Sequence, residues 1–360
     1  MTQGEYSIWY SIFIFIFSTI VCLLISQSRF INRSNLFTIP FLSPYVGLFL
    51  SVIAVFGITN CPADLGSDKY RYLEMFQYAD SLDFSKDIAW QYFTYLSKNI
   101  LINEWLYFLV IALFYIGCYN IFAKKYFGER YKSYFLVLAI GSMGFYAYGI
   151  NTLRAGMALG FVLLAFCYRK NKLIYVLISL IAISFHKSMV LPLTLFYCLH
   201  FYKNVKTCII VWMIMLIISF LNIGILSELI QSLFSDVDER VVSYMSATEN
   251  DSYVKAGFRW DFIVYSVFPI FMGYYYVMKK NFKEEFYIQV LNTYILANAF
   301  WLVVIRIPYS DRFAYLSWFL APFILIYPLT RAHIFVHQQK RMSQIIFIMV
   351  FVNFALNVLR

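Results

Sequence analysis

The sequence is poor in charged residues and lacks the features of a soluble domain. Only 13% of its 360 residues are Asp, Glu, Lys or Arg, against about 25% in a typical soluble domain, and 62% are hydrophobic. No nucleotide-binding loop and no linker is present. Five of the six cysteines fall in or beside hydrophobic segments, so they form neither a disulfide framework nor a metal-binding spacing. These absences exclude a soluble globular protein.

Hydrophobic segments of about 20 residues recur along the chain, and this is the length that crosses the hydrocarbon core of a bilayer. The first segment has no basic start and no small-residue cleavage site, so we expect it to be retained rather than removed as a signal peptide. We predict a single all-α membrane domain over residues 1–360 with about twelve spans, at 7–27, 42–59, 105–123, 133–149, 153–168, 173–185, 188–201, 207–226, 260–278, 286–305, 313–328 and 343–359.

The pair of segments around His186 is unusual in length. Residues 173–201 are too many for one span and too few for two full ones. Basic residues flank both sides of the pair, so we expect the chain to return to the side from which it started. A short or re-entrant hairpin does this if its tip, at His186, is sheltered by protein or water.

The distribution of charge predicts which side of the membrane each loop faces. The loops that we assign to the cytoplasm carry 17 Lys and Arg against three Glu, whereas the rest of the chain has a net charge of −4. The overall charge of +10 therefore lies in short loops between spans, which argues against nucleic acid as a partner. In this topology both termini face outward.

Two longer segments, residues 60–104 and 227–259, face outward in this topology. Both are acidic, and the first is rich in aromatic residues, including Tyr70 and Tyr72. Aromatic residues that alternate with charged ones predict amphipathic helices at the outer leaflet. They also suit sugar rings, whose apolar faces stack on aromatics. An aromatic belt at the membrane surface remains the simpler interpretation.

Cationic residues lie near the predicted amino-terminal ends of three spans. Arg154, the pair His186-Lys187 and Arg312 occupy these positions, with Arg306 a short way before Arg312. Helix starts carry unpaired backbone N–H groups and the positive end of the helix dipole, and both favour anions. A diphosphate satisfies guanidinium groups and helix-end amides together. The cations therefore predict an outward-facing site for a lipid-linked diphosphate.

Simpler interpretations of each residue stay open. An arginine at a span end such as Arg154 commonly extends to the lipid headgroups. Lys187 and Arg306 also suit the role of interface anchors, Asp311 and Arg312 that of a local ion pair, and a lone histidine is often only hydrogen-bonded.

Four short motifs, in order, resemble the EpsG family of membrane proteins. Residues 66–76 (GSDKYRYLEMF) resemble the family's first outer-loop pattern of Gly, Asp, Tyr and Phe, which includes Asp68. Residues 151–158 (NTLRAGMA) are similar to its arginine motif and residues 184–188 (SFHKS) to its F-H-x-S motif. Asp311-Arg312 is similar to its late outer-loop arginine. One departure is that residues 59–63 lack the arginine expected before Asp68. Either Lys69 or Arg71 supplies this charge, or the contacts with the donor's sugar differ from those of the family.

The resemblance implies a Wzy-type polymerase of the bacterial cytoplasmic membrane, related to the GT-C glycosyltransferases. Such an enzyme joins undecaprenyl-diphosphate-linked oligosaccharide units into O-antigen, capsule or exopolysaccharide. Its partners would be the undecaprenyl-diphosphate-linked oligosaccharide, membrane lipids, a chain-length regulator and other polysaccharide-assembly proteins, with no cofactor. The outer segment contains no adjacent D-x-D pair, so we expect no metal requirement and activity unaffected by a chelator.

The implied roles cover two sets of residues. The catalytic set is Arg154 and Arg312 for the leaving diphosphate, His186 as general base or, in its charged form, as a hydrogen-bond partner of the diphosphate, and Asp311 as an alternative base or as the residue that orients Arg312. The substrate-binding set is Asp68, which is also an alternative base, with Tyr70, Tyr72, Lys187, Arg306 and Tyr309. A flippase for the same lipid, a membrane O-acyltransferase and a structural scaffold are the alternatives.

Overall fold

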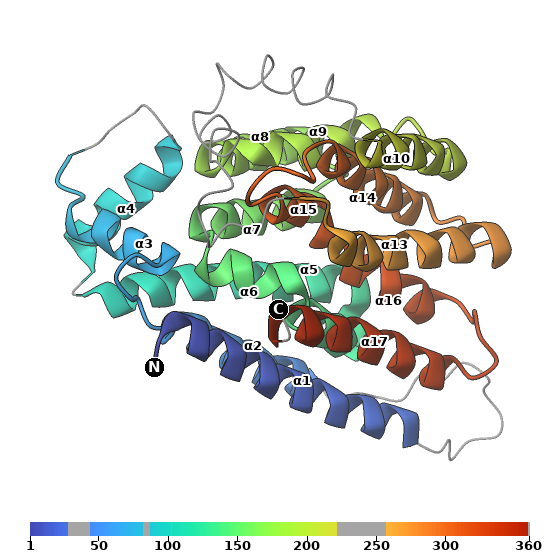
Figure 1. Cartoon of the computed structure of the whole chain (residues 1–360), viewed down its shortest axis with the longest axis horizontal. Coiled ribbons are helices and arrows are strands. Elements are labelled where there is room, and N and C mark those ends of the chain that lie inside the picture. The colour runs from blue at the N-terminus through green and yellow to red at the C-terminus, as the bar shows by residue number, and fades with distance from the viewer. Residues whose placement is uncertain (28–43, 82–86, 102, 222–256, 359–360) are drawn as a thin grey trace. The chain divides into compact units, whose positions relative to one another are not determined.

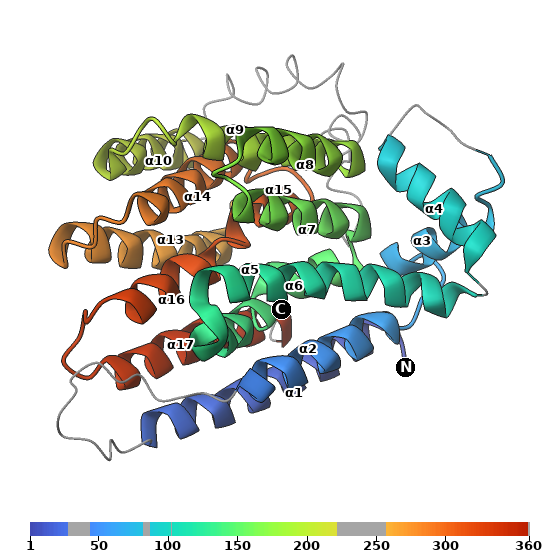
Figure 2. The ribbon, with the colours of Figure 1, turned by 180° about the vertical axis from the view of Figure 1, so that it is seen from behind.

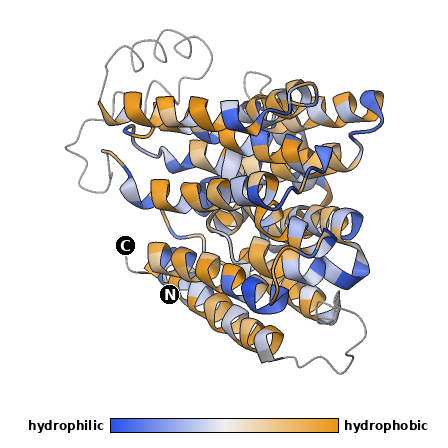
Figure 3. Ribbon diagram, turned by 90° about the vertical axis from the view of Figure 1, so that its right-hand side faces the viewer, coloured by the Kyte–Doolittle hydropathy of each residue, from blue (hydrophilic) through white to orange (hydrophobic). Residues whose placement is uncertain are grey.

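The predicted all-α class is confirmed. The computed structural model describes residues 1–27, 44–81, 87–101, 103–221 and 257–358, and every regular element within these ranges is a helix (Figure 1). Hydrophobic residues dominate these helices (Figure 3). The second predicted outer segment, 227–259, lies almost entirely outside the described residues.

Within the described ranges, six helices are long and apolar enough to cross a membrane, or seven if the bent pair α6–α7 counts as one span. The predicted count of about twelve is therefore not confirmed. The six are α1 (Gln3–Gln27), α5 (Glu104–Ile140), α13 (Trp260–Tyr274) with the π-helix η2 (Tyr275–Lys279), α14 (Glu285–Val303), the pair α15 (Asp311–Trp318) and α16 (Ala321–Arg331), and α17 (Gln338–Val358).

The difference in number has two sources: α5 and the bent pair α6–α7 together cover three predicted spans (105–123, 133–149 and 153–168), and four other predicted spans coincide with short helices. The predicted spans 42–59, 173–185, 188–201 and 207–226 overlap α2 (Pro44–Thr59), α8 (Lys172–Phe185), α9 (Val190–Cys198) and α10 (Val205–Phe220), and residues 42–43 and 222–226 lie outside the described residues. These helices are apolar but only 9 to 16 residues long. At about 1.5 Å per residue each is shorter than the roughly 30 Å hydrocarbon core.

The chain forms two compact units, and each is described by itself. Unit 1 comprises Met1–Leu193 and Leu325–Arg360, and unit 2 comprises Thr194–Ile324. In unit 1, α1 packs beside α17 and α2 packs beside α5 (Figures 1 and 2).

Helix α5 reverses direction at Gly128, inside the predicted inner loop. Gly128 has φ 65° and ψ 178°, a conformation that favours glycine. The ring of Phe135 contacts the rings of Phe122 and Phe127, and the ring of Phe145 contacts that of Tyr115. The residues after Gly128 therefore run back along those before it.

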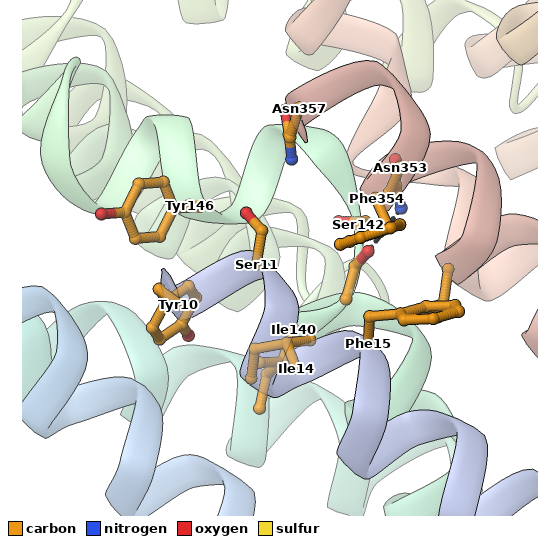
Figure 4. Close-up of a pocket in the computed structure, with 12 residues that line it drawn as sticks. Tyr10, Ser11, Ile14, Phe15, Ile140, Ser142, Tyr146, Asn353, Phe354 and Asn357 are labelled. Carbon is orange, nitrogen blue, oxygen red and sulfur yellow. Dashed lines mark hydrogen bonds between the residues drawn. The ribbon is translucent and has the colours of Figure 1, made fainter. Parts of the chain in front are cut away.

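A second break separates α5 from α6 (Met143–Ile150). The side-chain amide of Asn353 on α17 donates to the carbonyl of Gly141, and a Cβ at Gly141 would lie 2.9 Å from Val350. A cavity of about 20 Å³, lined by Tyr10, Ser142 and Asn353 among others, lies beside the break (Figure 4). This volume suits one water molecule, so the cavity is too small for a substrate.

Unit 2 is held together by a buried polar network. The indole N–H of Trp212 on α10 donates to Asn298 Oδ1 on α14 over 2.8 Å. Asn298 Nδ2 donates to Ser266 Oγ on α13 over 3.1 Å and to Ser317 Oγ on α15 over 3.0 Å. Ser266 Oγ also accepts from Trp318 Nε1 at 2.8 Å. Hydrogen bonds between buried polar side chains thus hold α10, α13, α14 and α15 together.

Candidate functional site

Arg154 lies in the first turn of α7 (Leu153–Cys167), directly after a sharp bend. Helices α6 and α7 meet at 120°, and Thr152 between them has φ −131° and ψ 55°. The bend needs glycine at position 156, because a Cβ there would lie 2.2 Å from the carbonyl oxygen of Tyr148 on α6. The local sequence R-A-G therefore lets the two helices approach and sets the position of the arginine.

The guanidinium of Arg154 pairs with a buried carboxylate that the sequence did not single out. Arg154 Nη1 donates to Asp87 Oδ2 over 2.7 Å, and the side chains are 19% and 1% exposed. Asp87 precedes α4 (Ile88–Ile100) with φ 47° and makes no capping bond to that helix, although an aspartate at this position normally does. The carboxylate holds Arg154 instead. Only the tertiary structure reveals this pair, because 67 residues separate its members.

A cavity of about 240 Å³ lies beside this pair in unit 1. Its walls include Met75 and Tyr78, from the end of α3 (Asp68–Gln77) and just after it, Trp90 and Thr94 from α4, and Arg154. The indole N–H of Trp90, which is 2% exposed, has no hydrogen-bond partner among the described residues. Within the same ranges Arg154 Nε is also buried without a partner. Both donors are covered by protein, so they are buried polar groups without a partner and do not face the cavity.

His186 lies at the same end of unit 1 as Arg154. Helices α7 and α8 are antiparallel neighbours joined by a short turn, so the end of α8 lies near the start of α7. The ring of Phe185 contacts Phe161 of α7 and Phe93 of α4. The Tyr175 hydroxyl on α8 donates to the carbonyl of Leu193 over 2.8 Å, which requires α9 to fold back along α8. A short hairpin with His186 at its tip results.

The ring of His186 has a defined orientation. It begins the 3-10 turn η1 (Lys187–Met189), and its Nδ1 accepts from the backbone N–H of Ser188 over 3.3 Å and contacts Ser188 Oγ at 2.7 Å. A backbone N–H only donates, so the neutral ring carries its proton on Nε2. The ring in this geometry is neutral, and whether His186 acts on the acceptor hydroxyl or on the diphosphate stays a prediction. Lys187 is exposed.

The outer-segment residues near Asp68 have different surroundings. Asp68 is partly exposed and 3.9 Å from Arg71, Tyr70 is half-buried, and Tyr72 is buried with its ring edge-on to Trp90. Tyr72 therefore packs α3 against α4 rather than presenting an open face for stacking. The assignment of these residues to sugar binding stays a prediction.

Lys69 is committed to a structural contact. Its Nζ is buried and donates to the carbonyls of Ile58 and Thr59 over 2.9 Å each and of Cys61 over 2.6 Å, at the end of α2. It also lies 4.5 Å from the ring centre of Phe108. Burial lowers the pKa of Lys69 to about 8. Lys69 therefore does not supply a substrate-binding charge, and of the two candidates only the exposed Arg71 can.

Several contacts gather the predicted outer segments at one end of unit 1. The backbone N–H of Gln3 at the start of α1 donates to Asp64, and its amide donates to Asn151 Oδ1 over 2.9 Å. Trp105 Nε1 at the start of α5 donates to Asn60 Oδ1 over 3.1 Å. The starts of α1 and α5, the end of α2 and the α6–α7 bend therefore lie together.

The basic loops lie at the other end of unit 1. Tyr126 before the α5 reversal donates to the carbonyl of Phe166 near the end of α7 over 2.6 Å, and its own carbonyl accepts from Arg331 over 2.7 Å. This end carries the charged residues Lys124, Lys125, Glu129, Arg130, Lys132, Arg169, Lys170 and Arg331. The basic loops of unit 1 thus gather at one end, and Arg154 lies at the opposite end.

The remaining predicted site residues belong to unit 2. Arg306 donates from Nε and Nη2 to the carbonyls of Ser219 and Phe220, both at 3.3 Å, and so caps α10. Arg312 stacks on the exposed ring of Tyr309 at 4.9 Å, and Asp311 accepts from the Tyr315 hydroxyl over 2.8 Å. The structure thus brings Arg154, Asp87 and the His186 tip to one end of unit 1, and Tyr309 and Arg312 together in unit 2.

A helical membrane protein with a buried arginine–aspartate pair beside a polar cavity is the class that this fold and site define. Comparison with known families is more specific. The EpsG family matches residues 44–360, so the chain belongs to this family, the family of Wzy-type polysaccharide polymerases. The resemblance predicted from four short motifs is confirmed. No curated protein and no solved structure matches the chain.

Proposed function

We propose that the chain is a polysaccharide polymerase that transfers a growing glycan from undecaprenyl diphosphate to a second lipid-linked repeat unit. Membership of the EpsG family supports a polymerase-type activity. The observation that carries the proposal is Arg154, which is fixed by Asp87 in the wall of a cavity at the start of an apolar helix. A GT-C-like relationship is part of this proposal and rests on the family resemblance alone.

The charge of unit 1 supports a reaction at the outer face of the bacterial cytoplasmic membrane. By the positive-inside rule, the end with the basic loops at 124–132 and 169–172 faces the cytoplasm. Arg154 and His186 lie at the opposite end. We therefore assign the cavity to the outer side, where lipid-linked repeat units would be joined into O-antigen, capsule or exopolysaccharide.

In the proposed reaction, a hydroxyl oxygen of the acceptor bonds to the anomeric carbon of the donor glycan. The bond between that carbon and the diphosphate oxygen breaks, and its electron pair stays on the diphosphate. The hydroxyl proton passes to a base. A fixed guanidinium stabilises the charge that grows on the leaving group. Arg154 is suited to this role because one Nη1–H holds Asp87, while other N–H groups of a side chain that is 19% exposed remain for a phosphate.

His186 serves as a second donor to the diphosphate in this proposal, since its Nδ1 accepts from Ser188 and its Nε2 carries the proton. The base for the acceptor hydroxyl is then a carboxylate, and Asp68 is the predicted one in unit 1. Arg312, with Arg306, Tyr309 and Asp311, stays a predicted contributor to binding of the diphosphate.

Gln in place of His186 keeps a hydrogen-bond donor at the position of the ring. If donation is the role of His186, His186→Gln should therefore retain more polymerase activity than His186→Ala.

Substitution of Arg154 tests the proposal directly. Arg154→Ala is expected to lower the polymerisation rate about 10²–10³-fold, because it removes a donor to the leaving group. Cells with this variant should display single repeat units on a gel of surface glycan instead of a ladder. Arg130→Ala, at an exposed arginine in the basic loop, is the matched control and should leave the ladder intact. Long chains from Arg154→Ala at normal membrane abundance would refute the proposal.

The bent pair α6–α7 also favours a second candidate, a flippase for the same lipid. Transporters form their binding sites from helices that are broken within the membrane, and the 120° bend next to Arg154 is such a break. The same gel separates the two functions. A flippase defect leaves no repeat units at the surface, whereas a polymerase defect leaves single units there.

A further inference from the structure

We infer that the basic end of unit 1 binds an anionic phospholipid, with the phosphate among cations around Tyr126 and the acyl chains along the exposed face of α5. The inference goes beyond the proposed function, because this end lies opposite Arg154 and takes no part in the reaction. Three observations support it: the convergence of cations on one tyrosine, the shortage of acidic residues there, and an apolar stripe that leads to the cations.

Cations from three segments converge on Tyr126, just before the reversal of α5. Arg331, at the end of α16, donates from Nη2 to the carbonyl of Tyr126 over 2.7 Å. Arg169, just after the end of α7, interacts with the Tyr126 side chain. Lys125 precedes Tyr126 in the chain and lies within electrostatic range of the thiol of Cys167, the last residue of α7. The fold thus gathers Lys125, Arg169 and Arg331 around one residue.

The same end of unit 1 has almost no negative charge. Ten Lys and Arg but only one acidic residue, Glu129, occur in the three segments concerned, which are 124–132, 168–172 and 331–341. Glu129 is already shared by two lysines, because it pairs with Lys124 over 3.1 Å and with Lys132. Lys125 forms neither a hydrogen bond nor an ion pair with any described residue. Cations that are held close together repel one another, and an anion among them removes that repulsion.

An exposed apolar stripe on α5 ends at these cations. Leu113 and Ile121 are 53% and 50% exposed, and Gly117 between them has open space where a Cβ would lie. Residues four apart are neighbours on one face of a helix, so the stripe leads from Leu113 to Lys125. Helix α5 is also one of the candidate membrane spans. A surface that is apolar along the span and cationic at its end fits a molecule with acyl chains and a negatively charged headgroup.

The inner leaflet of a membrane contains such a molecule. By the positive-inside rule, the basic end of unit 1 faces the cytoplasm. The cytoplasmic leaflet carries anionic lipids, and basic pockets between spanning helices on this side bind lipid headgroups. Free inorganic phosphate would match the cations but leave the apolar stripe unused. Basic inner loops are general in membrane proteins, whereas cations of three segments that meet at one tyrosine form a defined site.

Native mass spectrometry of the full-length protein in detergent tests this inference. The protein is mixed with equal concentrations of phosphatidylglycerol, which is anionic, and phosphatidylcholine, which has no net charge, and the ratio of the two bound lipids is measured. The wild-type protein should retain phosphatidylglycerol in preference. Inorganic phosphate, added at the concentration of the lipids, should not displace it, because phosphate has no acyl chains.

Lys125→Gln removes one cation of the site without breaking a hydrogen bond. One Lys or Arg near an anionic lipid surface is worth about 1 kcal/mol, so the preference for phosphatidylglycerol should fall roughly 5-fold. Arg331→Gln should lower the preference by a similar factor. Lys132→Gln is the matched control, since it removes the same charge from the same loop but from the pair with Glu129, and it should leave the ratio unchanged.

Any of four results would overturn the inference. Equal retention of both lipids by the wild-type protein would mean that no headgroup is selected. Displacement of the lipid by inorganic phosphate would mean that the cations take a free anion. An unchanged preference in Lys125→Gln would mean that this cation does not hold the headgroup, and an equal fall in Lys132→Gln would mean that only net charge matters. Lipid binding is measured without polymerisation, so failure of the proposed function gives a separate result.

Discussion

Gly156→Ala should disrupt the site without altering any polar group. A Cβ at this position would lie 2.2 Å from the carbonyl oxygen of Tyr148 and 3.0 Å from its carbonyl carbon. Real Cβ atoms essentially never approach closer than 3.0 Å, so α6 and α7 must separate by about 0.8 Å or more. The obstacle is backbone, which cannot rotate away as a side chain can. Arg154, two residues before Gly156, must move with α7.

The expected effect on activity is larger than that on stability. Overpacking of this kind costs about 1–3 kcal/mol of folding stability. A displacement of about 1 Å in a catalytic group can lower the rate about 10²-fold. Cells that carry Gly156→Ala should therefore contain the protein in their membranes and yet display few or no long glycan chains on a gel.

Two glycines provide matched controls. Gly149→Ala meets only the flexible end of Ile58 at 2.4 Å, and Gly117→Ala meets nothing within 4 Å. Gly117→Ala should leave the glycan ladder unchanged, and Gly149→Ala should have a smaller effect than Gly156→Ala. A full ladder from Gly156→Ala at wild-type abundance would refute the argument that the close α6–α7 contact positions Arg154.

Three further predictions concern individual contacts. Asp87→Ala should cost nearly as much activity as Arg154→Ala, with the double variant no worse than Arg154→Ala alone; additive losses in the glycan assay would show that the two act independently. Lys69 loses its proton in the folded protein at about pH 8 but in the unfolded chain only near 10.5, so its contribution to the free energy of unfolding should rise by up to about 3 kcal/mol over that window. The Tm of the wild type relative to Lys69→Met, measured in detergent, should therefore increase from pH 8 to 10.5, and a flat difference would contradict this. Asn298→Ala removes three interhelical hydrogen bonds of unit 2 and should lower its stability by about 1–3 kcal/mol; an unchanged Tm in detergent would show that the network is dispensable.

Local patterns in the sequence predicted the positions of helices and turns. The basic loop at 124–132 contains the reversal at Gly128, and the hairpin tip falls at His186 as expected. Hydropathy did not predict how many helices are long enough to span. It measures how apolar a segment is, and a short helix sheltered by other protein is as apolar as a full span.

Contacts between distant segments could not be predicted in the same way. Asp87 was one of several aspartates in the first outer segment, and nothing in its neighbourhood distinguished it. Lys69 looked like a substitute for a missing arginine until the structure placed it at the end of α2. Both residues obtain their roles from partners that the chain brings near only by folding, whereas Arg154 could be recognised because a cation at a helix start is unusual by itself.

The Asp87–Arg154 pair has a consequence for selectivity. Because the carboxylate already neutralises most of the guanidinium charge, the pair exerts little long-range attraction on passing anions. Inorganic phosphate from the surrounding medium would have to share Arg154 with Asp87, so small ions would compete only weakly for this arginine.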